Sequence, residues 1–352
     1  MAGMWVMSEL VPHRASPDEW RRYHVFRRRQ LREWRPEDPI PPDDVAELRL
    51  RRGDPTKLER YWQATVGGET VSLLETEATR PGTPEYETSR HLLYATAYVL
   101  RSHRGRGVGR AWIPTILALM DGLGATVLTS AAEDDSGRAF LGGLGAEPRM
   151  SERRSRLDLR RVDWDMVERW VREGEERSPA ARLEVYPNRV PDHLLPEYDA
   201  ACTELLNTMP FEDLDHGRIV VTPDWTREWY AQLEETASVV HTCIVRGPDG
   251  SIVGMTDVLR HSYEPGLVHQ LFTGVHPRAR GRRIGRWLKA AMLRHLRRAH
   301  PDTVAMVTEN VGSNRWMLDI NEALGFRPER VVTYYQLTRD RLAATRPPAP
   351  PG

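Results

Sequence analysis

The sequence predicts an α+β protein built from two similar halves, and three observations lead to this prediction. A length of 352 residues corresponds to about two domains of ordinary size. The segment Val99–Arg110 is similar to Val275–Arg286, and the turn Leu144–Ala146 is similar to Leu324–Phe326. Both pairs of segments lie about half a chain apart, and strand and helix patterns surround them in the same order.

The N-terminal half begins with a β-hairpin signal, because two runs rich in β-forming residues flank the turn residues Gly67 and Gly68. Apolar residues at helical spacing follow a third strand. The predicted strands are 62–66, 70–74, 92–100 and 126–129, and the predicted helices are 112–122 and a second one that ends at the 144–146 turn.

The C-terminal half repeats this order around the turn residues 247–250. The predicted strands are 239–245, 251–258, 268–275 and 303–308, and the predicted helices are 287–299 and a second one that ends at the 324–326 turn. The spacing of apolar residues in 162–177 predicts a connecting helix. We therefore expect an N-terminal domain at 1–160, a linker helix within 161–184, a C-terminal domain at 185–341 and a disordered Pro-rich tail at 342–352.

The composition narrows the classes of function. The 50 Lys and Arg residues balance the 50 Asp and Glu residues, so no global field attracts nucleic acid or an anionic membrane. Cys202, Cys243 and the twelve histidines show no metal-binding or redox spacing, so no metal site is expected. The start of the chain lacks a signal-peptide pattern, and no apolar run approaches the ~18 residues of a membrane span, so we expect a cytoplasmic protein.

Each half carries a loop rich in glycine and arginine between its third strand and the next helix. In the N-terminal half, Arg104, Gly107 and Gly109 have the spacing Arg-x-x-Gly-x-Gly. A helix N-terminus has unpaired N–H groups and a partial positive charge, so it favours an anion such as a pyrophosphate, which arginines also bind. In the C-terminal half Arg283 replaces the central glycine, and we expect it to adopt right-handed helical geometry.

These loops resemble the coenzyme A loop of the GNAT acyltransferase superfamily, and the two copies resemble a tandem GNAT protein of actinobacterial type with a layout similar to mycothiol synthase. The resemblance implies two domains, each a mixed, mostly antiparallel twisted sheet flanked by helices, and acetyl-CoA or another acyl-CoA as the donor. The implied coenzyme A-binding residues are Val275, Arg280, Gly281, Arg282, Arg283, Ile284, Gly285, Arg286, Asn310 and Asn314, with Val99, Arg104, Gly105, Arg106, Gly107, Val108, Gly109 and Arg110 in the other half. Arg283 either contacts the 3′-phosphate side of coenzyme A or blocks a degenerate site.

A second GNAT-like motif distinguishes the two halves. In the C-terminal half, the resemblance implies that Asn314 bonds the pantetheine arm, while Asn321 stands where many members carry a tyrosine that protonates the departing thiolate. The corresponding residues of the N-terminal half depart further from the motif: Asp134, Leu141 and Ala146. We therefore expect the C-terminal half to catalyse, with Asn321 and Tyr334 among its candidate catalytic residues. The acid is Tyr334 or Tyr335 on the closing strand, or a water, or no acid is needed because a coenzyme A thiol is a tolerable leaving group.

The third strand of the C-terminal half carries the remaining expected chemistry. Gln270 and Thr273 can share one face only with a β-bulge near Phe272 or Gly274, and a bulge frees an N–H that can act as an oxyanion donor. His269 lies eleven residues before Arg280, the spacing at which several GNAT members carry a catalytic glutamate, so it is the expected general base. The rival bases are Asp257, Glu264 and Glu309.

The resulting prediction is transfer of an acyl group from coenzyme A to a primary amine of a small molecule or peptide by direct attack. The phosphopantetheine arm of an acyl carrier protein is an alternative donor. A coenzyme A-binding module without turnover is a second alternative, because both halves lack the tyrosine. Nucleic-acid binding through the arginines of 278–286 is a third, which the zero net charge opposes.

Overall fold

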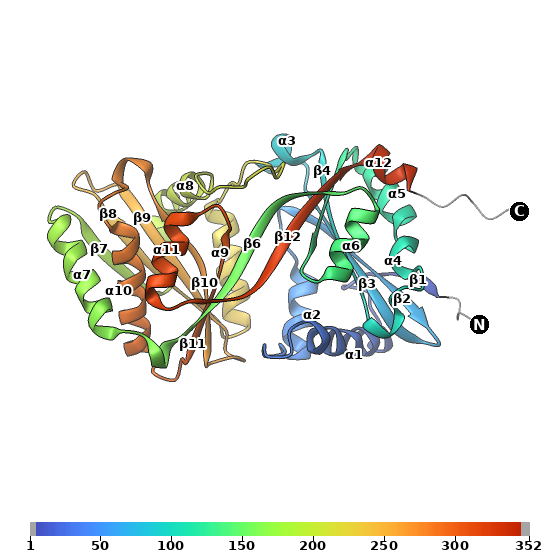
Figure 1. Ribbon diagram of the computed structural model, residues 1–352, viewed down its shortest axis with the longest axis horizontal. Coiled ribbons are helices and arrows are strands. Elements are labelled where there is room, and N and C mark those ends of the chain that lie inside the picture. The colour runs from blue at the N-terminus through green and yellow to red at the C-terminus, as the bar shows by residue number, and fades with distance from the viewer. Residues whose placement is uncertain (1–4, 346–352) are drawn as a thin grey trace, which may run out of the picture. The chain divides into compact units, whose positions relative to one another are not determined.

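The computed structural model describes residues 5–345, which form two compact units. Unit 1 contains residues up to 149 together with 213–218 and 333–345, and unit 2 contains 150–212 and 219–332. Each unit combines a mixed, mostly antiparallel sheet with helices, which confirms the predicted α+β class (Figure 1).

The sheet of unit 1 has the strand order β1-β2-β3-β4-β5-β12. Its strands are β1 (Val6–Leu10), β2 (Lys57–Val66), β3 (Glu69–Thr79), β4 (Leu92–Val99), β5 (Val127–Ala132) and the end of β12 (Arg327–Thr338). Strands β2 and β3 form the predicted hairpin around Gly67 and Gly68. Strands β4 and β5 are parallel, and their pairing ends at Tyr94 and Thr129, although both strands continue beyond these residues.

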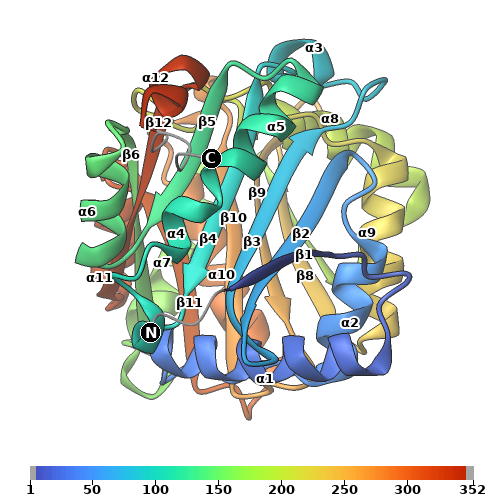
Figure 2. The same cartoon turned by 90° about the vertical axis from the view of Figure 1, so that its right-hand side faces the viewer.

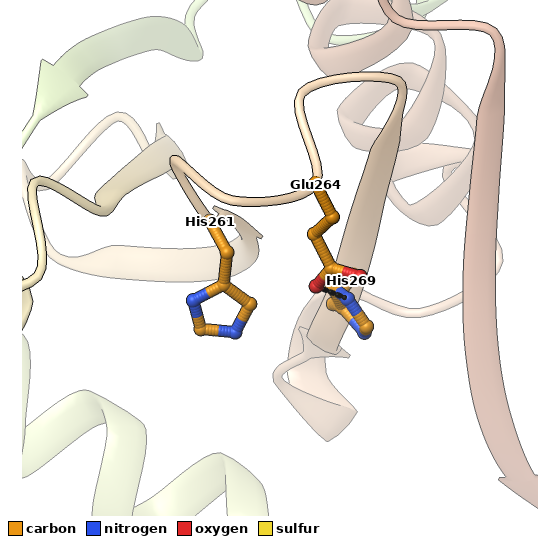
Figure 3. A group of neighbouring side chains, drawn as sticks. All are labelled: His261, Glu264 and His269. Carbon is orange, nitrogen blue, oxygen red and sulfur yellow. Dashed lines mark hydrogen bonds and ion pairs between the residues drawn. The ribbon is translucent and has the colours of Figure 1, made fainter. Parts of the chain in front are cut away.

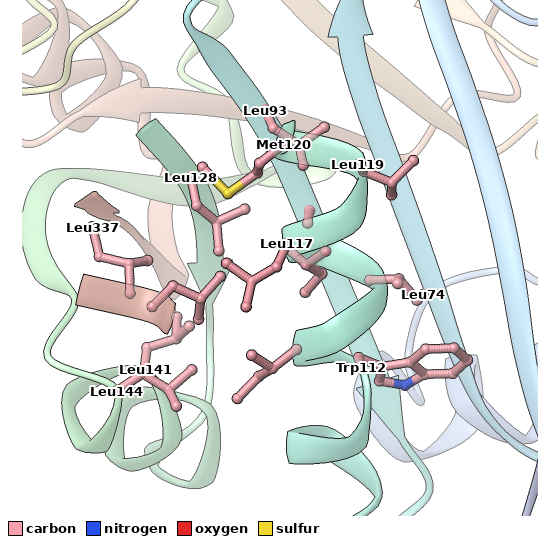
Figure 4. Packing of buried hydrophobic residues seen from close by; sticks show 14 of the residues in the cluster. Leu74, Leu93, Trp112, Leu117, Leu119, Met120, Leu128, Leu141, Leu144 and Leu337 are labelled. Carbon is pink, nitrogen blue, oxygen red and sulfur yellow. The ribbon is translucent and has the colours of Figure 1, made fainter. Parts of the chain in front are cut away.

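Helices cover both faces of this sheet. They are α1 (Pro17–Trp34), α2 (Asp43–Arg52), α3 (Tyr86–Ser89), α4 (Val108–Ala111), α5 (Ile113–Leu123), α6 (Asp135–Gly143) and α12 (Arg339–Ala344). Figure 2 shows helices α1 and α5 beside this sheet. Adjacent strand residues point to opposite faces, so Leu73 packs in the cluster of α1 residues while Leu74 packs in the cluster of α5 residues, where Figure 4 labels it. The predicted helix 112–122 is present as α5, which begins one residue later with Pro114 in its first turn, and the short helix α4 precedes it.

The sheet of unit 2 has the strand order β7-β8-β9-β10-β11-β6. Its strands are β7 (Arg182–Asn188), β8 (Val239–Arg246), β9 (Ile252–Arg260), β10 (Leu267–Val275), β11 (Ala305–Val311) and most of β6 (Glu147–Asp158). Strands β10 and β11 are parallel and pair only from Leu267 to Gln270. As with β4 and β5 in unit 1, the two strands continue beyond the last paired residues.

The helices of unit 2 also divide between two faces. They are α7 (Trp164–Arg177), α8 (Leu195–Leu206), α9 (Pro223–Glu235), α10 (Ile284–Ala299) and α11 (Arg315–Leu324). Helices α7 and α10 share one core, and α8 and α9 share another. The helix expected within the 161–184 linker is present as α7, but Val167 and Val171 are buried against α10, so it is part of unit 2.

The two closing strands are exchanged between the halves. Residues 152–158 of β6, which come from the N-terminal half, pair with β11 in unit 2. Residues 333–338 of β12, which come from the C-terminal half, pair with β5 in unit 1. Each expected domain is one continuous segment of the chain, whereas each compact unit combines segments from both halves.

The C-terminal tail begins later than expected. Residues 342–344 belong to α12, and Leu342 is fully buried in the core of unit 1, so the prediction of disorder is wrong for these residues. Residues 346–352 lie outside the described part of the chain. Within residues 5–345, none of the helices has the length and apolar character needed to cross a membrane.

Candidate functional site

The arginine and glycine loop of unit 2 joins β10 to α10. After Val275 a short turn at 277–279 leads to Arg280, whose Nε donates to the Val275 carbonyl at 3.2 Å and whose Nη2 lies 3.2 Å from Thr208 Oγ1. Gly281 has a φ of +78°, and a side chain there would meet open space. Arg282 is exposed, so the loop presents positive charge at the start of a 16-residue helix.

Arg283 departs from the expected geometry. It is the N-cap of α10, with a φ of 61° and a ψ of 15°, which is left-handed, so the prediction of right-handed geometry is wrong. Gly107 takes the same place in unit 1, with a φ of 90° and a ψ of −7°. The turn between strand and helix requires this conformation in both units, whichever residue occupies it. The Arg283 guanidinium pairs with Glu173 of α7.

Other predicted residues of the loop serve packing. The Ile284 side chain is buried in the core, which leaves only its backbone for a ligand. A Cβ on Gly285 would lie 3.3 Å from Ile320 Cδ1 and 3.7 Å from Val275 Cγ2, so the glycine lets α10 approach α11 and β10. The Arg286 guanidinium lies over the Trp170 ring, 5.1 Å from its centroid.

The loop of unit 1 has the same backbone design. Arg104 Nε donates to the Val99 carbonyl at 3.0 Å, and Gly105 and Gly107 have positive φ. Val108 is buried, and the indole of Trp5 lies against Gly107. The remaining predicted residues divide between packing and solvent: Gly109 lies close to the Phe140 ring, and Arg106 and Arg110 are exposed.

A carboxylate distinguishes the loop of unit 1. Asp134 caps α6 by accepting from the Gly137 N–H at 2.7 Å, and it pairs with Arg104 at 2.7 Å. Partial burial acts to raise the pKa of Asp134, but the hydrogen bonds from Gly137 and Arg104 outweigh it and lower this pKa. The loop arginine is therefore already bound to an anion that belongs to the chain.

The second motif of unit 2 lies on β11 and α11. Asn314 is the N-cap of α11, and its side chain accepts from the Met317 N–H at 3.4 Å. Asn321 is only 1% exposed and donates to Asn310 Oδ1 at 2.6 Å. An amide has no acidic proton to give a thiolate, and this one is enclosed, so the structure does not favour Asn321 as a catalytic group.

The predicted bulge in β10 is confirmed. The register of β10 against β9 shifts between Gln270 and Phe272. Gln270 Nε2 donates to Thr256 Oγ1 at 2.7 Å, and Thr273 Oγ1 lies 2.7 Å from the same hydroxyl, so both side chains share one face. Strict alternation would have separated them, and the extra residue at Leu271 brings them together.

The candidate base lies two residues before this bulge. His269 Nε2 is 2.6 Å from Glu264 Oε1, and the Glu264 side chain is buried (Figure 3). The ring of His261 lies edge-on to His269 with the centroids 5.5 Å apart. Sequence reasoning missed the grouping of these three residues, because their spacing follows no standard motif and depends on the turn between β9 and β10.

The other candidate groups lie in different surroundings. Asp257 is buried and accepts from Tyr198 Oη and Thr242 Oγ1, and burial raises its pKa to about 6. Glu309 is exposed. Tyr334 belongs to the part of β12 that pairs with β5 in unit 1, opposite Ala131. Because of the strand exchange, Tyr334 is not in the compact unit that contains His269.

Comparisons with known proteins identify the fold. No protein-family model matches the sequence, and no curated protein matches it. A tandem GNAT protein from the clavulanic acid biosynthesis pathway superposes with a TM-score of 0.72 at 20% identity, over 96% of this chain and 99% of that chain. This chain has the tandem GNAT fold.

Two further solved structures agree with the tandem GNAT fold. The GCN5-related N-acetyltransferase from Sphaerobacter thermophilus gives a TM-score of 0.62 at 13% identity, over 95% of this chain and 96% of that chain. A GCN5-related glucosamine N-acetyltransferase region of a fungal multi-domain β-N-acetylglucosaminidase gives 0.64 at 14% identity, over 96% of this chain and 38% of that one. At these identities the similarity establishes the fold, and chemistry must be argued from the residues.

Proposed function

We propose that this protein is a GNAT-family N-acyltransferase that moves an acetyl or other acyl group from coenzyme A to a primary amine of a small molecule or peptide. One observation carries the proposal: two loops separated by half a chain adopt the same backbone. In each, an arginine bonds back to the end of the strand and a left-handed residue begins the helix. Such a helix N-terminus with nearby arginines suits a pyrophosphate.

Unit 2 is the better candidate for the catalytic unit. The Arg280 guanidinium has a hydroxyl and a carbonyl as its neighbours, whereas Arg104 is paired with Asp134. The Asp134 carboxylate repels a pyrophosphate from the loop of unit 1. Unit 2 also contains the bulge in β10 and the pair His269 and Glu264.

In the proposed reaction, the amine nitrogen attacks the thioester carbonyl carbon that acyl-CoA supplies, the C–N bond forms, the C–S bond breaks, and the amine gives up one proton. His269 is suited to accept that proton. Glu264 accepts a hydrogen bond from the Nε2–H of His269, which leaves the lone pair on Nδ1 for the amine. The departing thiolate takes a proton from water, since neither Asn321 nor Tyr334 is suited to give one in unit 2.

Charge reversal in the two loops tests the proposal and the assignment of units. Arg282 and Arg106 are both exposed and stand at corresponding places, so Arg282→Glu and Arg106→Glu are matched variants. We expect Arg282→Glu to weaken coenzyme A binding by about tenfold or more, because it replaces a charge-assisted contact with repulsion. We expect Arg106→Glu to leave turnover within a few fold of the wild type.

The measurements are calorimetric titration with coenzyme A and turnover of acetyl-CoA with a panel of primary amines. Equal coenzyme A affinity in the wild type and Arg282→Glu would contradict the proposed site. Loss of turnover only in Arg106→Glu would move catalysis to unit 1.

Replacement of the proposed base is a separate test in the same assay. His269→Ala should lower kcat about a hundredfold with coenzyme A affinity unchanged. A loss of less than threefold would remove His269 from the mechanism.

A coenzyme A-binding module without turnover is the second candidate function. The observation that favours it is the enclosed Asn321, which is bonded to Asn310 where many GNAT members have a tyrosine. Coenzyme A binding without turnover on any amine would support this candidate, provided that a phosphopantetheinylated acyl carrier protein is also tested as the donor.

A further inference from the structure

Two histidines and one glutamate converge where β9 leads into β10. His261 and Glu264 lie on the connection between these strands, and His269 lies on β10. One donor atom from each residue lies within 4.8 Å of the other two, and this is the one group with such spacing found in residues 5–345 (Figure 3). The Glu264 side chain is 6% exposed and that of His269 is 27% exposed, so the cluster is enclosed on the glutamate side and open on the histidine side.

The surroundings of the cluster hold its donors in place. Two backbone hydrogen bonds shape the turn, from Glu264 N–H to the His261 carbonyl at 3.3 Å and from Leu267 N–H to the Glu264 carbonyl at 2.9 Å. Ser238 Oγ lies 3.1 Å from His261 Nδ1, and the Tyr263 ring is stacked on His261 with the centroids 4.9 Å apart. A hydrogen bond at Nδ1 orients the His261 ring, as a second hydrogen bond commonly does for a histidine that ligates a metal.

We propose that His261, Glu264 and His269 bind one Zn²⁺ ion, with a fourth position left to water or another ligand. Two imidazoles and one carboxylate with an open position form a donor set that zinc uses in proteins, with bonds of about 2.0–2.2 Å. Tetrahedral bonds of that length place donor atoms roughly 3.4 Å apart. Binding therefore requires the hydrogen-bonded His269 and Glu264 atoms to separate slightly from 2.6 Å and the His261 ring to move toward them.

A second histidine cluster in unit 2 lacks the geometry of a metal site. His295 and His300 approach opposite nitrogens of His241, at 3.0 Å and 2.8 Å. Their donor atoms therefore do not converge on one point. The donor atoms of His261, Glu264 and His269 lie within 4.8 Å of one another, and one of them is a carboxylate oxygen.

Zinc at this site and proton transfer by His269 exclude each other. A neutral imidazole that coordinates zinc through Nε2 carries its proton on Nδ1, the nitrogen that the proposed base uses. The zinc-loaded protein is thus expected to be blocked in acyl transfer, while the metal-free protein is competent. The binding itself does not depend on the proposed activity.

The test is metal binding by the full chain, stripped with a chelator and assayed without coenzyme A or amine. We expect calorimetry to give one Zn²⁺ per chain and Co²⁺ to give the visible absorption of a tetrahedral site. Glu264→Gln and His261→Ala should each weaken zinc binding at least about tenfold. His276→Ala is the matched control, because His276 pairs with Glu204 at 2.7 Å but belongs to no three-residue ligand group among residues 5–345, and this variant should bind zinc as the wild type does.

Unchanged zinc affinity in both Glu264→Gln and His261→Ala, or failure of the wild type to bind one equivalent, would overturn the proposal. If either variant fails to fold, zinc X-ray absorption of the wild type gives the answer directly. Two imidazole ligands are expected, and a first shell of water alone would count against the site. These results stand whether or not the protein transfers acyl groups.

Discussion

Arg283 holds a backbone conformation that ordinarily favours glycine. Its φ of 61° lies in the left-handed region, which costs a residue with a Cβ about 1–2 kcal/mol. In unit 1 the same place is occupied by Gly107, which adopts left-handed angles without this cost. The loop thus sets the angle in both units, and the arginine adds a side chain that reaches Glu173.

We expect Arg283→Gly to be more stable than Arg283→Ala by about 1 kcal/mol. Both variants lose the guanidinium and its ion pair with Glu173, so the comparison isolates the backbone. Urea denaturation followed by tryptophan fluorescence measures the difference. Equal midpoints for the two variants would show that the loop leaves the left-handed conformation once the arginine is removed.

Single residues also show where sequence reasoning ends. The bulge beside Gln270 was predictable, because period-two alternation cannot place Gln270 and Thr273 together. The left-handed angle of Arg283 was not, since nothing in the local pattern forbids right-handed geometry for arginine. The partnership of Glu264 with His269 depends on a turn whose shape the sequence does not specify.

At the scale of elements, strand β8 and helix α10 meet at three histidines. His241 of β8 is 4% exposed and lies between His295 and His300. Burial, and then the charges of His295, His300 and Arg260, lower the pKa of His241 to about 3, and burial lowers the pKa of the other two histidines. The packing of these elements therefore requires neutral histidines.

This cluster predicts loss of stability in acid. The unfolded chain protonates His241 near pH 6.5, whereas the folded chain keeps it neutral down to about pH 3, so the unfolded state binds more protons in that window. The free energy of unfolding should fall with pH below about 6.5, by up to about 1.4 kcal/mol per pH unit for this group. Between pH 7.5 and pH 5 the free energy of unfolding of His241→Gln should therefore fall by about 2 kcal/mol less than that of the wild type.

Urea titrations at the two pH values measure this difference. The control is His193→Gln, which alters an exposed histidine of unit 2 and should keep the wild-type dependence on pH. If His241→Gln keeps that dependence as well, the acid sensitivity arises elsewhere.

The hairpins and the helix α10 could be predicted because hydrophobic periodicity and turn residues are local signals. The helix expected to begin at Trp112 was predictable for the same reason, whereas the short helix α4 that precedes it was not, because four residues are too few to show a helical period. The sequence also could not predict which sheet β6 and β12 each join. Alternation of apolar and polar residues shows which face of a strand is buried, but it does not identify the strand that pairs with it.

At the scale of the whole molecule, the exchanged strands make each unit depend on both halves of the chain. We expect a chain that ends after residue 332 to lose the fold of unit 1, because it lacks the strand that pairs with β5 and three residues buried in that core, Tyr335, Leu337 and Leu342. Hydrogen exchange should show β5 amides without protection, while β10 amides in unit 2 stay protected.

The control for this truncation is a chain that ends after residue 345, which keeps all of β12 and α12 and should protect β5 as the full chain does. Full protection of β5 in the shorter chain would show that unit 1 is stable without the exchanged strand.

The exchange also has a consequence for the time at which each unit can be completed during synthesis. Residues up to 149 leave the ribosome first, yet the last strand of unit 1 ends at Thr338. At about 5–20 residues per second, the strand that completes the N-terminal unit arrives roughly 10–40 s later. During this interval β5 has an open edge and the core of unit 1 is uncovered, so the nascent chain offers a surface that a ribosome-associated chaperone can hold.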